Sequence, residues 1–236
     1  MTTTGITPTR FAGLCAAAAL SIAVGGLAQA QAAPAATAAA ADDTPVPKVF
    51  GKRFPPLTAA DMTPEQKAMA RSMARGPRGG LRGPASAYLR SPELGESLQK
   101  VGEVVRYRMT FPVGLRELAA AQVSRYMNSP YEWAAHSVQS VDGGIGKDTI
   151  EAIALHRHPP HMKPEEVAVY DFTEDLLQKH AVSDAHFKEV QSRWGDRGVM
   201  DLTGVIGYFV VVGMALNVDE HPAPPGANPL PRLAAR

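Results

Sequence analysis

Three ionisable side chains near the middle of the chain have the types and spacing that acid–base chemistry needs. Glu117, Glu132 and His136 lie in the segment RELAAAQVSRYMNSPYEWAAHSVQSVDGGI. His136 follows Glu132 by four residues, so on a helix the two side chains share one face. A histidine titrates near neutral pH and can transfer protons. Taken alone, a histidine on a helix is more often structural, so the segment makes His136, Glu117 and Glu132 candidates for a catalytic group, to be judged with the rest of the sequence.

A succession of helices must position these residues. Thr63-Pro64-Glu65-Gln66 predicts a capped helix start, and Ser91-Pro92 predicts another, with apolar residues spaced along one face. No stretch alternates with a period of two, so the expected class is all-α. The expected later helices cover residues 115–127, 129–143, 147–155, 164–180, 183–194 and 199–218.

The spacing Glu117-x11-Ser129-x2-Glu132-x3-His136 resembles the active-site stretch of the carboxymuconolactone decarboxylase and alkyl hydroperoxidase D superfamily. A later segment, VSDAHFKEVQSRWGDRGVMDLTGVIGYFVVVGMALN, is similar to the closing segment of that family. The resemblance covers about residues 54–218. It implies an alkyl hydroperoxidase D-like helical bundle in which Glu117 faces His136, and a homo-oligomer, commonly a trimer or hexamer.

The peroxidase branch of this family reads Glu-x11-Cys-x2-Cys-x3-His, and here Ser129 and Glu132 stand at the two cysteine positions. A disulfide-forming peroxidase needs a thiolate to attack the peroxide and a second thiol to resolve it. Cys15, the only cysteine, lies in the N-terminal apolar run. Thiol peroxidase activity is therefore not expected, although the family resemblance alone would suggest it.

Glu132 has two interpretations, which do not exclude each other. It can take part in the chemistry of His136, or it can complete a capping box with Ser129, whose hydroxyl would cap the helix. Ser129 itself is expected to act as the cap, because a serine hydroxyl ionises at far too high a pH and no Gly-x-Ser-x-Gly elbow surrounds it.

Four neighbouring residues are candidates for substrate binding: Arg116, Arg125, Tyr131 and Trp133. Either arginine could hold a carboxylate through two parallel hydrogen bonds, or lie solvated at the surface. The aromatic rings could line an apolar pocket or belong to the core. The histidines between His156 and His161 suggest a metal at first sight. Pro159 and Pro160 interrupt them, so a polar loop without a metal is expected.

The resemblance implies cofactor-free chemistry on a carboxylated lactone or a related carbon acid. His136 would donate the proton, Glu117 would orient the ring, and Arg116 or Arg125 would hold the carboxylate. The alternative is a non-catalytic secreted bundle that binds a small ligand or acts through assembly. A Glu117–His136 contact inside a closed pocket would favour the enzyme.

The ends of the chain differ in composition from the helical domain, expected over residues 54–220. Residues 1–30 have one charged residue, an apolar run and a small-x-small site at Ala28-Gln29-Ala30, which is typical of a signal peptide and predicts a periplasmic or secreted protein. Residues 31–53 are expected to be an Ala/Pro-rich linker, disordered up to Lys48, and residues 221–236 a loosely packed Pro-rich tail.

Two classes of partner are not expected. The net charge of +1 gives no electrostatic support for nucleic acid. The apolar segment LTGVIGYFVVVGMALNV is short for a membrane span and contains three glycines, so it is expected to be buried in the bundle or at a subunit interface.

Overall fold

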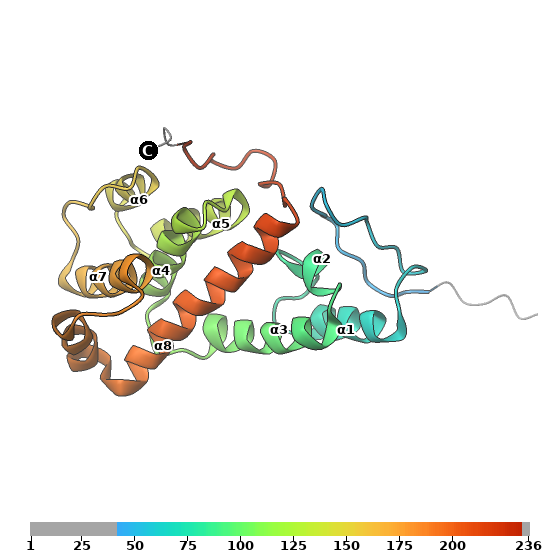
Figure 1. Cartoon of the computed structure of the whole chain (residues 1–236), viewed down its shortest axis with the longest axis horizontal. Helices are drawn as coiled ribbons and strands as arrows, with labels where there is room; N and C mark the ends of the chain where they lie inside the picture. The colour runs from blue at the N-terminus through green and yellow to red at the C-terminus, as the bar shows by residue number, and fades with distance from the viewer. Residues whose placement is uncertain (1–41, 233–236) are drawn as a thin grey trace, which may run out of the picture. The chain divides into compact units, whose positions relative to one another are not determined.

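The structure, a computed structural model, describes residues 42–232. Within this range the chain forms eight helices and no strand, which confirms the all-α class (Figure 1). The helices are α1 Pro64–Arg75, α2 Ala85–Tyr88, α3 Pro92–Tyr107, α4 Val113–Tyr126, α5 Pro130–Asp142, α6 Lys147–Ala154, α7 Pro164–Lys179 and α8 Asp184–Val218. The expected signal peptide lies outside the described residues.

The centre of the fold is the hairpin of α4 and α5. Helix α4 contacts α5, α6, α7 and α8, and its alanines are fully buried, so neighbouring helices pack on almost every side of it. Gly114 and Gly143 hold the open end of the hairpin together. A Cβ atom on Gly114 would lie 2.3 Å from the carbonyl oxygen of Gly143, so only glycine permits this approach.

Helix α8 joins the two helices that were expected separately over residues 183–194 and 199–218. The backbone bends at Gly195, whose φ of 66° favours glycine. Its apolar part packs on α3, α4 and α7. Within the described residues it is the one helix long and apolar enough to cross a membrane, but half of its most apolar window is buried inside the fold. A core helix passes the same test.

Residues 42–53 are held against the domain, so the disordered spacer expected up to Lys48 is wrong for this part. The side chain of Asp42 accepts hydrogen bonds from Lys67 and Thr44. The buried carboxylate of Asp219 accepts hydrogen bonds from the backbone N–H groups of Gly51 and Phe54, at 3.1 and 3.0 Å. Residues 31–41 of the expected linker lie outside the described residues.

The C-terminal tail is also anchored. His221 is buried, Leu230 packs on the core, and the carbonyl oxygen of Pro231 accepts a hydrogen bond from Arg125 at 2.8 Å. The tail is therefore held at these three points, whereas residues 222–226 between them are exposed, as expected of a loosely packed segment. Prolines leave few backbone donors, but they do not prevent side chains and carbonyl groups from packing.

Candidate active site

His136 lies between two carboxylates inside the α4–α5 hairpin. Its Nδ1 atom is 2.5 Å from Oε2 of Glu117 on α4, and its Nε2 atom is 3.3 Å from Oε2 of Glu132, one turn earlier on α5. All three side chains are buried. The Glu132 contact has ion-pair distance but lacks the geometry of a hydrogen bond. The structure thus brings together the three residues that the spacing predicted as catalytic.

The charges of this group depend on one another. Burial alone would lower the pKa of His136, but the contacts with Glu117 and Glu132 outweigh it and raise the pKa. Burial alone would raise the pKa of Glu117, but the bonds from His136 and Arg116 lower it. The favoured state is therefore an imidazolium paired with a carboxylate, and the two groups titrate as a coupled pair.

Arg116 holds Glu117. Its Nε and Nη2 atoms donate to Oε1 of Glu117 at 3.2 and 3.0 Å, and its Nη1 atom donates to the carbonyl oxygen of Arg106 at 2.7 Å. The two carboxylate oxygens of Glu117 therefore have separate partners, the arginine on one and the histidine on the other. Because this guanidinium is already engaged with Glu117 and Arg106, the geometry does not favour the expected role of Arg116 as a substrate clamp.

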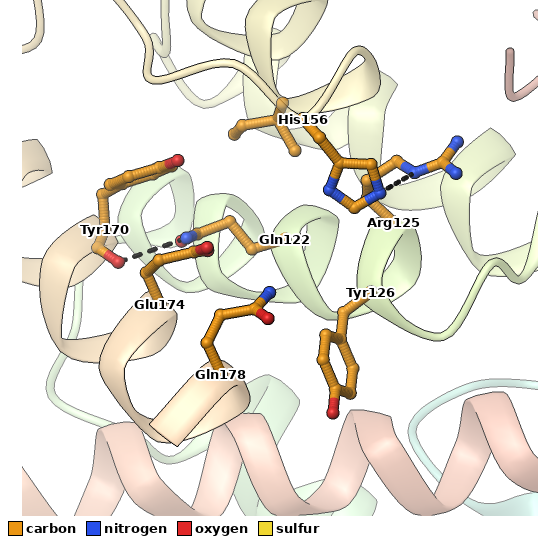
Figure 2. A pocket seen from close by; sticks show the side chains of 8 residues that line it. Gln122, Arg125, Tyr126, His156, Tyr170, Glu174 and Gln178 are labelled. Carbon is orange, nitrogen blue, oxygen red and sulfur yellow. Dashed lines mark hydrogen bonds between the residues drawn. The ribbon is translucent and has the colours of Figure 1, made fainter. Parts of the chain in front are cut away.

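Arg125 lies at a different pocket, so the expectation that it serves the same site is corrected. It is buried on α4 and donates from Nε to Nε2 of His156 at 3.1 Å (Figure 2). That second pocket has a volume of about 470 Å³. Its lining consists of Gln122, Arg125, Tyr126, Ile153, His156, Tyr170, Glu174 and Gln178. Eight residues of α4, about 12 Å along the helix axis, separate Arg125 from Glu117.

The two aromatic candidates on α5 have different positions. Tyr131 lines the His136 pocket, and its hydroxyl accepts a hydrogen bond from the backbone N–H of Gly83 at 3.1 Å. Trp133 is buried in the hydrophobic core and is absent from the pocket lining. The core interpretation is therefore the right one for Trp133, and its candidate role in binding is corrected.

The capping box predicted at the start of α5 is not formed. Ser129 occupies the N-cap position, but its buried hydroxyl makes no hydrogen bond. Its backbone N–H donates to the carbonyl oxygen of Ser124 at 2.9 Å, so it is not available to Glu132. The carboxylate of Glu132 turns to His136 instead. By contrast, the capping box predicted for Thr63 and Gln66 is confirmed.

The pocket in front of His136 has a volume of about 370 Å³ and carries an excess of positive charge. Four arginines face only two carboxylates. The lining residues are Arg78, Arg82, Gly83, Arg106, Tyr107, Arg116, Glu117, Tyr131, Glu132, Ala135, His136 and Gln139. Such a site favours an anionic ligand.

Three of the pocket arginines were not predicted from the sequence. Arg78 and Arg82 lie on the loop between α1 and α2, whose sequence GPRGGLRGP has no periodicity that could place it. Arg106 lies in the last turn of α3. The available signal was the repeated arginine in a glycine-rich loop, since glycines allow a backbone to approach a ligand.

The histidines of the loop after α6 do not form a metal centre. The His158 ring packs edge-on against Tyr170, with the ring centres 5.3 Å apart, and its Nε2 atom is 3.9 Å from Asp171. Across residues 42–232, no group of three or more His, Asp or Glu side chains has an arrangement that could hold a metal ion.

The fold and site define a class of protein. Residues 92–175, which include Glu117, Glu132 and His136, match the model of the Carboxymuconolactone decarboxylase family. The segment that carries the candidate site is therefore similar to this family, and the helical domain shares the fold of alkyl hydroperoxidase D-like structures. No curated protein matches the sequence.

Solved structures share the fold at low sequence identity. The alkylhydroperoxidase AhpD core of an uncharacterized peroxidase-related protein from Ralstonia eutropha has a TM-score of 0.57 and 14% identity, over 75% of this chain and 91% of that one. A protein of unknown function from Agrobacterium tumefaciens has a TM-score of 0.51 and 15% identity, over 57% and 93%. The debrominase Bmp8, as a cysteine-to-alanine variant with 2,3,4-tribromopyrrole, has a TM-score of 0.56 and 13% identity, over 75% and 94%.

Proposed function

We propose that this domain is a cofactor-free enzyme of the periplasm or the extracellular space. In this proposal it decarboxylates or isomerises a carboxylated lactone or a related carbon acid. The observation that carries the proposal is the His136 ring held between Glu117 and Glu132, beside a pocket with an excess of arginines. Buried, charge-shifted titratable groups that line a pocket favour a catalytic role over a structural one.

The proposed reaction uses His136 as the proton donor. When a carboxylated unsaturated lactone loses carbon dioxide, the C–C bond breaks and its electron pair spreads into a dienolate. The Nδ1–H of His136 stays hydrogen-bonded to Glu117 throughout. The proton on Nε2 is therefore the one transferred to carbon. Glu132, next to Nε2, then favours the return of a proton from solvent to the ring. In isomerisation, the neutral ring would remove a proton from carbon and return it at another position.

The pocket charge supports the same chemistry. Negative charge develops on the dienolate oxygens in the transition state, and fixed cations already oriented around the pocket stabilise it without reorganisation. The bound 2,3,4-tribromopyrrole in the Bmp8 structure supports a ligand about the size of one five-membered ring for this fold. The absence of both thiols at Ser129 and Glu132 argues against peroxide reduction here.

The experiment is a proton-exchange and decarboxylation assay on protein that starts at Gln31. Carbon dioxide release and deuterium incorporation from D₂O are followed with carboxylated butenolides. His136→Gln should remove turnover, whereas Val138→Ala, on the solvent side of the same helix, should leave it unchanged. Turnover by His136→Gln at the wild-type rate would refute the proposal. A ligand that binds in the pocket without any turnover would support the non-catalytic alternative.

A further inference from the structure

Arg78 and Arg106 are two pocket arginines that form no ion pair within the described residues. The Nη1 atom of each is shielded from solvent and has no hydrogen-bond acceptor. In residues 42–232, no carboxylate oxygen lies within 4.0 Å of either guanidinium, whereas Arg116 is paired with Glu117. Buried charged donors are rarely left without an acceptor, so this arrangement indicates a place for an anionic group.

Further donors surround the same place. The guanidinium of Arg106 lies over the rings of Tyr208 and Phe209, 5.4 and 5.0 Å from their centres. The hydroxyls of Tyr88 and Tyr208 are buried close to each other, and neither makes a hydrogen bond of good geometry. Burial raises the pKa of both tyrosines, so they remain hydrogen-bond donors at neutral pH.

This cluster adjoins the acid–base group. Phe209 packs edge-on against the His136 ring, with the ring centres 4.4 Å apart, so Arg106 and His136 contact the same phenyl ring. Burial lowers the pKa of Arg78, and the charge of Arg106 lowers it further, which places the two guanidinium groups close enough to repel each other. A negative charge between them would relieve this repulsion.

We propose that Arg78 and Arg106 form a carboxylate subsite that fixes the substrate next to His136; this inference rests on the function proposed above. The carboxylate accepts hydrogen bonds from Nη1 of both arginines, with the Tyr88 and Tyr208 hydroxyls as additional donors. Arginine suits this role because its planar fork matches the geometry of a carboxylate. This subsite holds a carboxylate that does not react, and so differs from the clamp on the departing carboxylate that was expected of Arg116 or Arg125.

The carboxylate bound here keeps its charge throughout the reaction. Decarboxylation removes negative charge from the departing carboxylate, so arginines placed on that group would stabilise the substrate more than the transition state and slow the reaction. Arginines on a group that does not react bind both states equally and position the reacting carbon. The subsite therefore determines which acids are accepted, while His136 carries out the proton transfer.

Half of this subsite comes from outside the segment that the family model matches. Arg78 precedes residues 92–175, on the loop between α1 and α2. Gly79 and Gly80 in this loop have positive φ values and no neighbouring atoms within 4 Å of an added Cβ, and Gly83 is tied to Tyr131. The loop thus supplies a specificity element that belongs to this chain and cannot be inferred from the family match.

The test uses two probes of one shape, 2-furoate and furan-2-carboxamide, and measures binding by calorimetry. Wild-type protein should bind 2-furoate at least about tenfold more tightly than the neutral amide. Arg78→Gln and Arg106→Gln should each weaken 2-furoate binding by about tenfold or more, and Arg106→Lys by less, with amide binding changed by less than about threefold. Arg75→Gln, an equal change of charge at the exposed end of α1, is the control.

Stability provides a second readout. Arg78→Gln removes a buried charge that lacks a partner, so its melting temperature should equal or exceed that of the wild type, whereas loss of a structural arginine would lower it. Equal wild-type affinity for the two probes, or 2-furoate binding unaffected by both substitutions, would overturn the subsite. No 2-furoate binding at about 10 mM would overturn it as well. Charge-dependent binding of 2-furoate without any turnover of carboxylated butenolides would support the subsite and reject the proposed reaction. Turnover by the wild type, with 2-furoate binding unchanged in Arg78→Gln and Arg106→Gln, would support the reaction and reject the subsite.

Discussion

Glu117 and His136 form a buried pair that joins the two helices of the central hairpin, with 2.5 Å between Oε2 and Nδ1. The pKa of His136 is raised, so the pair stabilises the fold fully below 6.5 and loses this effect as the pH rises through the higher folded value. The pKa of Glu117 is lowered, so its contribution is present above 4.5 and lost as the pH falls through the lower folded value.

Glu117→Gln should therefore lower the free energy of unfolding most between pH 4.5 and pH 6.5. Removing one partner of a buried pair leaves the other charge uncompensated, which typically costs about 3–5 kcal/mol of unfolding free energy. Urea unfolding of the wild type and the variant at a series of pH values measures the difference. It should have a plateau between pH 4.5 and 6.5 and decrease on both sides. A difference independent of pH would contradict the ion pair.

Glu132→Gln distinguishes an electrostatic role from a capping role. Because Glu132 helps to raise the pKa of His136, the substitution should lower that pKa, as followed by an NMR titration of the ring. If the imidazolium is the proton donor, the alkaline limb of the pH–rate profile should move to lower pH by the same amount. A cap alone would change stability by about 1 kcal/mol and leave the titration of the ring unchanged.

The protein should show no thiol-dependent reduction of an alkyl hydroperoxide. Ser129 and Glu132 occupy the thiol positions of the peroxidase pattern, and neither residue can form a disulfide. Steady-state assays with a dithiol reductant check this prediction. The double variant Ser129→Cys with Glu132→Cys is the positive control, because thiols at the start of α5 would be one helical turn apart. Turnover by the wild-type protein would contradict it.

We propose that α8 mediates assembly of identical subunits. Met200, Met214 and Val218 are more than half exposed on this helix, and Gly207 has no atom within 4 Å of an added Cβ. Gly207→Glu should thus fit the isolated subunit but dissociate the oligomer by burying a charge in an apolar contact. Light scattering should give a multimer for the wild type and for Ser192→Glu, an exposed control on the same helix, and a smaller mass for Gly207→Glu. A monomeric wild type would end this proposal.

Export and cleavage remain a prediction from the sequence. The small residues at Ala28 and Ala30 suit signal peptidase, so the mature chain should begin at Gln31. Mass spectrometry of protein isolated from a bacterial periplasmic fraction would show this end. Cleavage also removes Cys15, so the mature chain should not react with a thiol reagent. Recovery of an intact Met1 in the membrane fraction would contradict the prediction.

The sequence predicted the helices well because their starts carry local signals. Proline follows the cap residue at Thr63 and Ser91, and glycines end the helix that carries His136. It missed the single-turn helix α2, which has too few residues to show a period. The resemblance to the family's active-site stretch implied the Glu117–His136 contact, and in the structure one hairpin positions both residues.

The remaining parts of the site depend on tertiary packing. The carboxylate of Glu132 can either complete a capping box with Ser129 or pair with His136. Only the packing of the surrounding helices decides between the two. The arginines of an irregular loop have no periodicity to indicate their direction, so Arg78 could not be placed. Arg125 was expected at the same site because it flanks the helix that carries Glu117, but it lies about 12 Å further along α4 and lines another pocket.

Asp219 has a mechanical consequence. The carboxylate at the end of α8 receives the backbone of Gly51 and Phe54 and the hydroxyl of Ser86, so the incoming chain and the last helix are clasped at one point. A Cβ on Gly51 would overlap Asp219, which makes the clasp intolerant of any other residue there. Tension applied through the N-terminal segment would load the contacts of Asp42 with α1 first and this clasp next, before it reached the α4–α5 hairpin.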